Sequence, residues 1–597
     1  MMCAHFCTIF DVCFFITRQL LTLRDSLSLS LSFSFSHHAG RGLTGTKLGC
    51  GEGGFGACTV VVSSVSYDAR EDSYSYSHKA VNACLTPIYA LEGHHVITVE
   101  GLGNARDGMH PVQMAIASAH GSQCRFCTPG FVMSMYALLL NSRNKSNENR
   151  ISPRDIEEAL SGNLCRCTGY RPILKGFVDA FVENKVYSQE TIDGDISNAF
   201  KKSMKVSDGT TVPICASTGQ PCTNGCGDTD GENSSRTDDG KVSEENGTKT
   251  NAAIKEPLFP IELKRRAKEE NGLVTLAFQG GNAMTHPIHN DGVKWHRPTS
   301  LKELLDLKDA YPGNDSKIVC GNTEIGVEIK FKKASYPRRI HVSGNTIEEL
   351  GRISMNYDNG EAVFGAAISL SDLEHACSSK EASNVERFIA ISKQLKWFAG
   401  RQIRNVSTLG GNIVTGSPIS DLNPLWIALD AIFVVTSKQG GNRYVKARDF
   451  FLAYRKVDLK PDEILKQVEL KAFNDSGISS TTTGKEYFHE YKQSHRREDD
   501  IAIVTCGARA FFDTSTGECL DFSIGFGGLS FKTIFCSQTA SGMVGKRMTK
   551  ETLDFLMSAI EKECLVDENA PGGMAQYRTT LAKSFVFKFF LHCVGDL

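Results

Sequence analysis

The sequence predicts a multidomain protein of the α+β class. Its 597 residues exceed the ~250–300 residues at which a single hydrophobic core stops growing, so several domains are expected. Apolar residues recur at helical spacing in FVMSMYALLL at 131–140, whereas KIVC at 317–320 reads as a buried strand. A polar stretch at 187–256 separates two more apolar parts, as a solvated linker would.

The composition narrows the class of protein further. A hydrophobic content of 41% and a charged content of 22% are ordinary for a globular protein. The net charge of -2 gives no indication of a nucleic-acid partner or a membrane surface. Twenty cysteines without a recognisable secretory signal favour reduced thiols and metal ligation over a disulfide framework, and therefore a cytoplasmic location.

Residues 1–42 are atypical. The apolar stretch from Cys3 to Leu23 is interrupted by Asp11 and Arg18, and no run reaches the ~20 apolar residues of a membrane-spanning helix. It also lacks the basic start and the small-residue cleavage site of a signal peptide. The following SLSLSLSFSFS alternates like a half-buried strand but is also low-complexity sequence, so we predict disorder or an aberrant start.

From Leu43 the sequence continues as LTGTKLGCGEGGFGACTVVV. Plant-type ferredoxins bind a [2Fe–2S] cluster through C-x4-C-x2-C and a distant fourth cysteine. Cys50, Cys58 and Cys84 occupy three of these four positions, and Phe55 occupies the second. Because phenylalanine cannot ligate iron, this first site has three thiolates. Ordinary buried cysteines are the alternative interpretation.

A second cysteine motif is formed by GSQCRFCTPG at 121–130 and SGNLCRCTGYRP at 161–172. Its four cysteines are Cys124, Cys127, Cys165 and Cys167. Four thiolates that meet at one end of a helical bundle can hold a tetrahedral metal or an iron–sulfur cluster. Zinc is one alternative, although Cys-x-Cys is unusual for it. A disulfide or redox pair and plain structural cysteines are the others.

Helix signals flank the second motif. Ser152 is a candidate N-cap, Pro153 fits the first helical position, and Asp155 can close a capping box. A further helix is expected after Pro172. The two cysteine loops should therefore meet at one end of a small bundle.

A new domain begins near Pro257. The helix LKELLDLK at 301–308 and the strand KIVC lead into GNTEIG at 321–326. A strand that feeds a turn with outward-pointing amides is a pyrophosphate cradle. A second tight turn is expected over 410–412, and two such turns suit an extended dinucleotide. Neither turn matches the Rossmann fingerprint.

These motifs together resemble the xanthine dehydrogenase and aldehyde oxidase family, in a plant-like form. FFLAYRKVDLKPDEIL and YKQSHRREDDIAIV look more like xanthine dehydrogenases than aldehyde oxidases. The resemblance implies six segments. They are an atypical N-terminus at 1–42, an incomplete β-grasp, plant-type ferredoxin-like domain at 43–100, a four-helix [2Fe–2S] domain at 101–186, a linker at 187–256, an α+β FAD-binding domain of PCMH type at 257–475, and a small α/β subdomain like the C-terminal part of CO dehydrogenase flavoproteins at 476–597.

The resemblance also implies roles for individual residues. The diphosphate of FAD would be wrapped by Ile318, Val319, Cys320, Gly321, Asn322, Thr323, Glu324 and Ile325. Phosphate and ribitol would be bound by Thr408, Leu409, Gly410, Gly411 and Asn412, and Phe398 would flank the isoalloxazine. Asp421, Leu465 and Lys492 would complete the flavin site, and Tyr454 and Asp499 would meet NAD. Each cysteine motif would hold a [2Fe–2S] cluster, the first one lacking a ligand at Phe55.

In the resembled family a molybdopterin domain that hydroxylates purines or aldehydes follows this portion. Molybdopterin is not expected on this chain, so purine hydroxylation by the chain alone is not expected and no catalytic residue is assigned. The resemblance implies electron transfer between the clusters, FAD, and NAD or dioxygen. The alternatives are an inactive fragment or a subunit of a split molybdenum hydroxylase. A homodimer and a molybdopterin-carrying chain are the partners to consider.

Overall fold

The computed structural model describes eight main segments and four short strands. The segments are 43–91, 93–104, 108–142, 151–183, 259–269, 293–472, 484–496 and 499–595, and the short strands are 13–15, 203–205, 211–213 and 286–287. Most of the predicted atypical N-terminus and most of the predicted linker lie outside the described residues.

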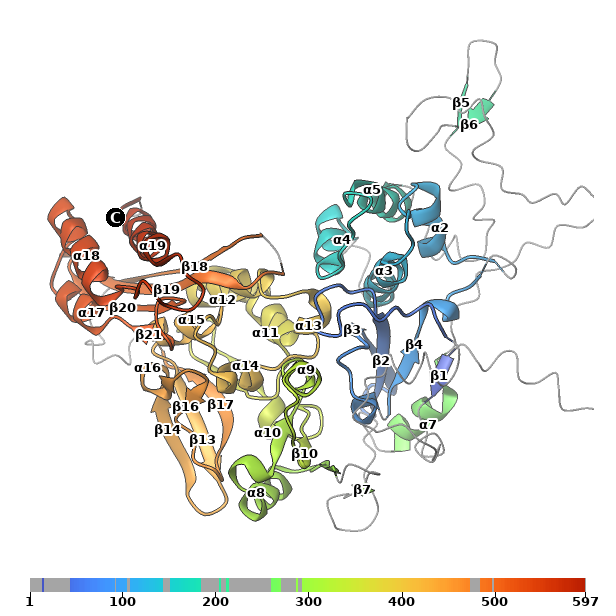
Figure 1. Cartoon of the computed structure of the whole chain (residues 1–597), viewed down its shortest axis with the longest axis horizontal. Coiled ribbons are helices and arrows are strands. Elements are labelled where there is room, and N and C mark those ends of the chain that lie inside the picture. Colours follow the sequence, from blue (N-terminus) through green and yellow to red (C-terminus); the bar gives the residue numbers. More distant parts are fainter. Residues whose placement is uncertain are drawn as a thin grey trace, which may run out of the picture.

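The helices and strands of the described residues follow one another from the first sheet to the C-terminal helix (Figure 1). The helices are α2 (Pro111–Ser118), α3 (Thr128–Ser142), α4 (Pro153–Leu160), α5 (Arg171–Val178), α7 (Ile261–Glu269), α8 (Leu301–Ala310), α9 (Ile325–Phe331), α10 (Glu348–Gly351), α11 (Leu370–Cys377), α12 (Glu386–Lys396), α13 (Arg401–Arg404), α14 (Leu409–Thr415), α15 (Asn423–Ala428), α16 (Ala447–Phe450), α17 (Ser537–Met543), α18 (Lys550–Glu563) and α19 (Ala575–Gly595). Short 3-10 or π-helical turns are η1 (Ile88–Leu91), η2 (Val99–Gly101), η3 (Asp179–Glu183), η5 (Gly313–Asp315) and η6 (Glu381–Asn384). Within the described ranges, no helix combines the length and the apolar character needed to cross a membrane.

The strands form several separate sheets. They are β1 (Cys13–Phe15), β2 (Thr59–Asp68), β3 (Ser73–Asn82), β4 (His95–Ile97), β5 (Ser203–Lys205), β6 (Thr211–Pro213), β7 (His286–Pro287), β8 (Lys294–His296), β9 (Lys317–Val319), β10 (Arg338–His341), β11 (Ile353–Met355), β12 (Ala362–Gly365), β13 (Ile432–Ser437), β14 (Gly441–Lys446), β15 (Phe451–Ala453), β16 (Lys456–Val457), β17 (Ile464–Leu470), β18 (Gly484–Ser494), β19 (Ala502–Asp513), β20 (Cys519–Gly527) and β21 (Ile534–Phe535). The combination of separate helical and sheet regions is that of an α+β multidomain protein.

The first part of the molecule is a sheet covered by helices. Its strand order is β1-β4-β2-β3, and β2 and β3 pair antiparallel. Helix α3 lies against β2 and β3, and α2, α4 and α5 surround it (Figure 1). Val61 and Ile97 of the sheet share one hydrophobic core with Phe131 and Met135 of α3. The two cysteine-bearing regions are therefore packed as one block.

The predicted start of α4 is confirmed. Pro153 is its first residue, and the Ser152 hydroxyl accepts a hydrogen bond from the N–H of Asp155 at 3.2 Å. The Asp155 carboxylate in turn accepts from the N–H of Ser152 at 2.8 Å. This capping box ends the preceding loop and fixes where the helix begins.

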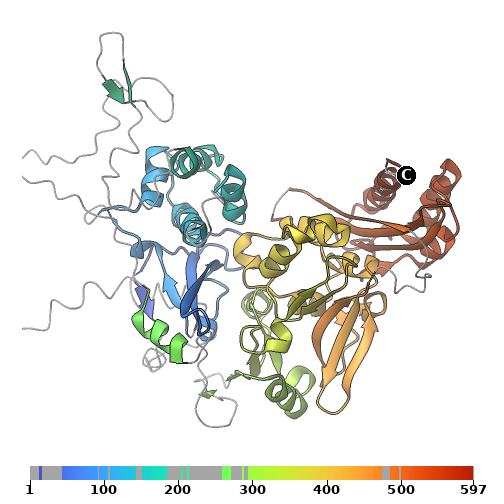
Figure 2. The ribbon, with the colours of Figure 1, turned by 180° about the vertical axis from the view of Figure 1, so that it is seen from behind.

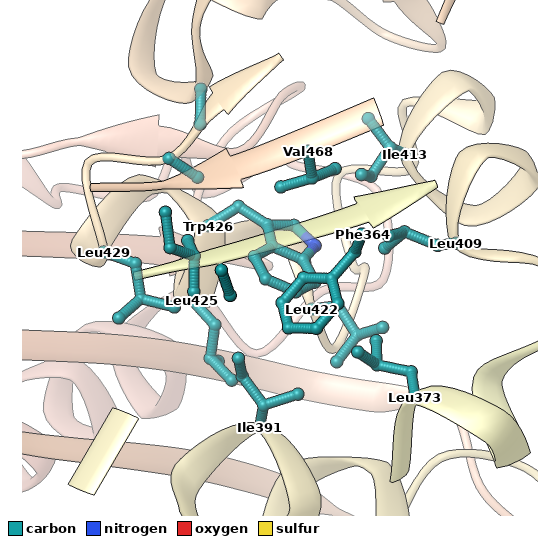
Figure 3. Close-up of a cluster of buried hydrophobic side chains, with 14 of the residues drawn as sticks. Phe364, Leu373, Ile391, Leu409, Ile413, Leu422, Leu425, Trp426, Leu429 and Val468 are labelled. Atoms are coloured by element: carbon teal, nitrogen blue, oxygen red, sulfur yellow. The ribbon is translucent and has the colours of Figure 1, made fainter. Parts of the chain in front are cut away.

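Residues 293–472 lie between the first part and the C-terminal part in both views (Figures 1 and 2). Strands β8, β10 and β9 are parallel, and a second, antiparallel sheet has the order β11-β12-β17-β13-β14. Figure 3 shows the core of this part, where the fully buried Trp426 is surrounded by Phe364, Leu422 and Val468. Large apolar side chains in such a core supply much of the driving force for folding.

The C-terminal part is an antiparallel sheet with helices on both faces. Its strand order is β18-β19-β20-β21, and α15 contacts β19 and β20. Alternate residues of β19, such as Cys506 and Ala508, join Phe585 and Phe589 of α19 in a separate core. Helices α18 and α19 also contribute buried side chains to this core.

One local prediction is wrong. Residues 410–412 do not form a tight turn but lie in the first turn of α14, which is capped by Thr408. Gly410 is needed for close packing, because a Cβ there would lie 2.8 Å from the carbonyl oxygen of Ala366. The two glycines were read as turn residues, although in this position they permit a helix to approach a neighbouring strand.

Candidate cofactor-binding sites

The second cysteine site is built by two loops at one end of the helical bundle. Cys124 and Cys127 precede α3, and Cys165 and Cys167 lie between α4 and α5. The Cys127 thiol lies close enough to Cys165, and the Cys167 thiol close enough to Cys124, for each neighbour to raise its pKa. Each pair takes one sulfur from each loop.

The surroundings of these thiols differ. Burial and the neighbouring Cys165 raise the pKa of Cys127 to about 12, and the hydrogen bond with Cys124 raises the pKa of Cys167. Burial alone would raise the pKa of Cys165, but Thr168 outweighs it and the net shift is downward. The Thr168 hydroxyl lies 3.1 Å from the Cys165 sulfur, and the Thr168 N–H donates to that sulfur at 3.5 Å. Thr168 therefore favours a thiolate at Cys165.

The donor set fits a two-iron cluster. A [2Fe–2S] cluster is held by four thiolates, and two sulfur pairs can each serve one iron. A single zinc ion would need its four ligands to converge on one point.

The first cysteine site is more deeply buried. Cys58 and Cys84 are 4% and 0% exposed and belong to a core with Val60 and Val81 of the first sheet. The two thiols lie close together, and their interaction lowers the pKa of Cys58 and raises that of Cys84. The Cys58 thiol also donates to the Asn82 side chain at 3.7 Å. Cys50 is half-buried at the rim.

The position of Phe55 leaves this first site incomplete. Its ring is 42% exposed and lies 3.2 Å from the place where a Cβ on Gly49 would stand. Its carbonyl oxygen accepts a hydrogen bond at 3.0 Å from the N–H of Leu164, in the loop of the second site. One sulfur pair is therefore complete, whereas Cys50 has no sulfur partner at position 55. The residues present do not fit a four-thiolate cluster.

The predicted diphosphate turn follows β9. Asn322 has a left-handed backbone with φ 58°, and Gly321 packs so closely on Val406 that a Cβ would lie 1.9 Å from its carbonyl oxygen. Among the described residues, no acceptor receives the backbone N–H groups of residues 321–324. Such a run of free amides next to a helix N-terminus fits an anionic diphosphate.

The second predicted phosphate segment has fewer backbone N–H groups free to bind a ligand. The N–H groups of Leu409 and Gly410 donate to the carbonyl oxygens of Ile368 and Ala366 at 3.1 and 2.7 Å. The Thr408 hydroxyl accepts from the Gly411 N–H at 3.2 Å, and it also lies near the Cys320 thiol. The segments 318–325 and 408–412 are thus brought together, but the backbone amides of Leu409 and Gly410 are already used.

A buried arginine holds the turn that carries Phe398. Arg404 is 2% exposed and donates to the carbonyl oxygens of Phe398 and Ala399, each at 2.7 Å. It also pairs with Glu374 at 3.2 Å. Burial lowers the pKa of Arg404 to about 10, a value that leaves it charged at neutral pH. The backbone position of Phe398 is therefore held by Arg404 and its ion pair with Glu374.

Asp421 and Lys492 form a buried ion pair at 2.6 Å, and Lys492 also donates to the carbonyl oxygen of Trp397 at 2.7 Å. Burial raises the pKa of Asp421 to about 6 despite Lys492. Burial likewise raises the pKa of Asp499 to about 6, against the attraction of nearby Arg496, Lys492 and Arg404. A cavity of about 470 Å³ is lined by Trp397, Lys492 and their neighbours. Asp421 therefore contacts Lys492, which lines the cavity, and Asp499 lies within Coulombic range of Lys492.

The two remaining predicted residues differ in exposure. Tyr454 is 63% exposed at the tip of the β15–β16 hairpin, and the adjacent Arg455 pairs with Glu324 and Glu328 at 2.7 and 2.8 Å. This pairing places Tyr454 beside the diphosphate turn. Leu465 is 6% exposed and packs in the core of residues 293–472, called the flavin part after the flavin site predicted there.

Three residues with structural roles at these sites were not found from the sequence. They are Thr168 beside Cys165, Arg404 behind Phe398, and Lys330 beside the first cysteine loop. Arginine and lysine occur throughout the chain, so their type carries no signal by itself. Thr168 is the exception, since a threonine directly after Cys-x-Cys is a plausible donor to sulfur.

The comparisons with known proteins agree with this division into parts. Three family models match, namely the [2Fe-2S] binding domain at 98–178, the FAD binding domain in molybdopterin dehydrogenase at 290–470, and the CO dehydrogenase flavoprotein C-terminal domain at 489–593.

Curated relatives and a solved structure give the extent of the similarity. Xanthine dehydrogenase of Oryza sativa subsp. japonica is 43% identical over 569 residues, which are 93% of this chain and 38% of the relative. Xanthine dehydrogenase 1 of Arabidopsis thaliana is 44% identical over 559 residues, 92% of this chain and 37% of the relative. The carbon monoxide dehydrogenase of Hydrogenophaga pseudoflava matches 50% of this chain and 95% of its own at 25% identity, with a TM-score of 0.43. The chain spans less than half the length of the curated relatives.

Proposed function

We propose that this chain, which is homologous to the iron–sulfur and FAD portion of xanthine dehydrogenases, transfers electrons between a flavin and one [2Fe–2S] cluster. The cluster would be held by Cys124, Cys127, Cys165 and Cys167. The observation that carries the proposal is the pairing of these four thiols across two loops. NADH is the proposed electron donor, and a reducing, cytoplasmic compartment would keep the thiols ligating.

The chain segment from Phe398 to Gln402 connects the two proposed cofactor sites. The segment that carries Phe398 continues into Gln402, whose side-chain amide donates to the Ser134 hydroxyl of α3 at 3.0 Å. The N–H of Arg401 donates to the carbonyl oxygen of Ser161 at 3.3 Å, in the loop that leads to Cys165. One segment therefore carries the proposed flavin partner Phe398 and also donates hydrogen bonds to α3 and to the cluster loop.

The protein's own residues would bind and orient the cofactors. When bound, FAD exchanges a hydride with NAD and single electrons with an iron–sulfur cluster. The free amides at 321–324 would hold the diphosphate, Phe398 would flank the isoalloxazine, and Lys492 would be kept in place by Asp421. Thr168 would stabilise the thiolate of Cys165. Tyr454 and Asp499 would meet the nicotinamide nucleotide.

No electron-transfer step is assigned to the first cysteine site, because its residues do not fit a four-thiolate cluster. Purine hydroxylation is an activity of xanthine dehydrogenases as whole proteins. For this chain it is proposed only together with a molybdopterin-carrying partner or a further part of the protein.

Anaerobic purification followed by cofactor analysis tests the proposal. We expect about one flavin and about two irons per chain, since one complete cluster holds two irons. NADH should bleach the flavin absorbance band when no acceptor is present and should reduce an artificial dye when one is supplied. A preparation with neither flavin nor iron would refute the proposal.

Phe55 favours a second candidate, in which the chain is inactive by itself or serves as one subunit of a split molybdenum hydroxylase. An incomplete first site would interrupt a relay that uses both clusters. Under this alternative, NADH–dye turnover is absent from the isolated chain and a molybdopterin protein co-purifies at native expression. Turnover by the isolated chain would exclude the inactive form.

A further inference from the structure

The first cysteine loop is tied to the flavin part by two side chains. The Asn322 amide donates to the carbonyl oxygen of Leu85 at 2.8 Å. Lys330 of α9 donates to the carbonyl oxygen of Gly51 at 3.2 Å and also to that of Cys84. Both donors therefore come from the diphosphate turn or the helix that follows it, and all three acceptors flank ligand positions of the first site.

The ammonium group of Lys330 donates to backbone carbonyl oxygens. No carboxylate pairs with its ammonium group in the part of the chain that the structure describes. The ammonium instead lies within Coulombic range of the thiols of Cys50, Cys58 and Cys84. A partly buried ammonium group needs hydrogen-bond partners to offset its lost hydration, and carbonyl oxygens supply them here. Here it bridges the two backbone segments that carry the three thiols.

Apolar packing makes the same junction continuous. Val327 of α9 and Val406 pack against the core that contains Cys58, Cys84 and Leu85. Gly326 allows the Leu85 side chain to approach, since a Cβ on Gly326 would lie 3.3 Å from it. The diphosphate turn and the first cysteine loop thus share a core as well as hydrogen bonds, and such closely packed segments do not move independently.

We propose that Lys330 and Asn322 are positioning residues that couple occupancy of the flavin diphosphate turn to the order of the first cysteine loop. The coupling rests on the proposed flavin function. Binding of a diphosphate to the amides at 321–324 fixes the backbone of Asn322, which fixes its hydrogen bond to Leu85, and α9 then holds Lys330 over Gly51 and Cys84. Linkage requires the reverse as well, so an ordered cysteine loop raises the affinity for flavin.

Hydrogen–deuterium exchange on the full chain tests the coupling, with flavin-free and FAD-saturated protein compared. We expect FAD to slow amide exchange at 51–56 and 84–86 by about tenfold, in the range of typical coupling effects. Lys330→Met should reduce this protection to less than about twofold while flavin stoichiometry stays near that of the unaltered protein. Lys332→Met is the matched control, because Lys332 follows Lys330 by two residues, its side chain is 56% exposed, and among the described residues its ammonium pairs with Glu324 at 3.8 Å and not with the cysteine segments.

Asn322→Gly is an independent second test of the coupling. Glycine keeps the left-handed backbone and removes only the side-chain amide that donates to Leu85. It should weaken the protection at 84–86 at saturating FAD. Equal protection in all four proteins would overturn the coupling. Failure of FAD to bind, read from flavin absorbance, would overturn the proposed function instead. Even then, faster loop exchange in flavin-free Lys330→Met than in Lys332→Met would support the tether, and equal exchange would overturn it.

Discussion

The two cysteine sites belong to one packed block but differ in completeness and in exposure. The first has a buried pair, Cys58 and Cys84, and an unpaired Cys50 beside the partly exposed Phe55. The second has two sulfur pairs, with Cys124 and Cys167 exposed at the surface. Burial by itself therefore does not make a cluster site; a full set of converging thiols does. The site that is better shielded from solvent is the one that lacks a ligand.

The sites also differ in how they meet the flavin part. The first loop is approached by a lysine and an asparagine that donate to backbone carbonyl oxygens. The second is approached by Gln402, which joins Asn163 at the hydroxyl of Ser134. The first junction therefore includes a charged donor to backbone carbonyl oxygens, whereas the contact at Ser134 is made of neutral amides. The second junction also has an ion pair, between Lys396 and Glu158. The changes below test this contrast.

Cys127→Ala should have the largest effect. It removes one sulfur of the second site, and we expect iron to fall from about two atoms per chain to nearly none, because a two-iron cluster needs four thiolates. Iron analysis and visible absorbance measure the loss. Cys377→Ala, which removes a buried thiol from the core of the flavin part, should keep its iron. Unchanged iron in Cys127→Ala would place the cluster elsewhere.

Phe55→Cys should convert the first site into one like the second. A fourth thiol at position 55 would stand beside Cys50, so we expect about two further irons per chain after anaerobic reconstitution. Leu48→Cys adds a thiol at a similarly exposed position, 46% against 42%, and should add no iron. If the two variants behave alike, Phe55 is not what limits the first site.

Ser134→Ala should loosen the second junction. It removes the acceptor shared by Asn163 at 2.8 Å and Gln402 at 3.0 Å, and a buried donor without a partner costs about 2 kcal/mol. The melting temperature should fall, and amide exchange in α4 should rise. Ser142→Ala on the same helix loses only a bond to Leu139 and should leave both quantities nearly unchanged. If Ser134→Ala changes neither the melting temperature nor the exchange, the amides of Asn163 and Gln402 form other hydrogen bonds in the variant.

Lys396→Met should have the smallest effect. Lys396 pairs with Glu158 at 2.6 Å, with both side chains about 30% exposed, and such pairs contribute up to about 1 kcal/mol. Burial opposes ionisation of Glu158, but Lys396 and Arg154 outweigh it and lower its pKa below 4.5. The contribution is therefore present above pH 4.5 and is lost as the pH falls through the lowered pKa. Urea unfolding at several pH values measures it, and a pH-independent difference would contradict the assignment.

Local sequence patterns predicted much of the secondary structure around the sites. The capping box at Ser152, the helix at 301–308 and the strand before Gly321 are present as expected. The tight turn predicted over 410–412 is wrong because glycine serves both turns and close helix packing, and the sequence does not distinguish the two uses. The roles of Arg404 and Gln402 also escaped prediction, because each depends on a neighbour from another element.

The sequence by itself determined which residues can ligate and how far apart they lie along each loop. It identified Cys124 with Cys127, Cys165 with Cys167, and the missing ligand at Phe55, since these are matters of residue type and short spacing. Only the tertiary structure decided that Cys127 pairs with Cys165 across the loops and that Lys330 reaches Cys84 over a separation of 246 residues. The physical reason is that such contacts depend on how whole elements pack their apolar faces, which no short stretch of sequence encodes.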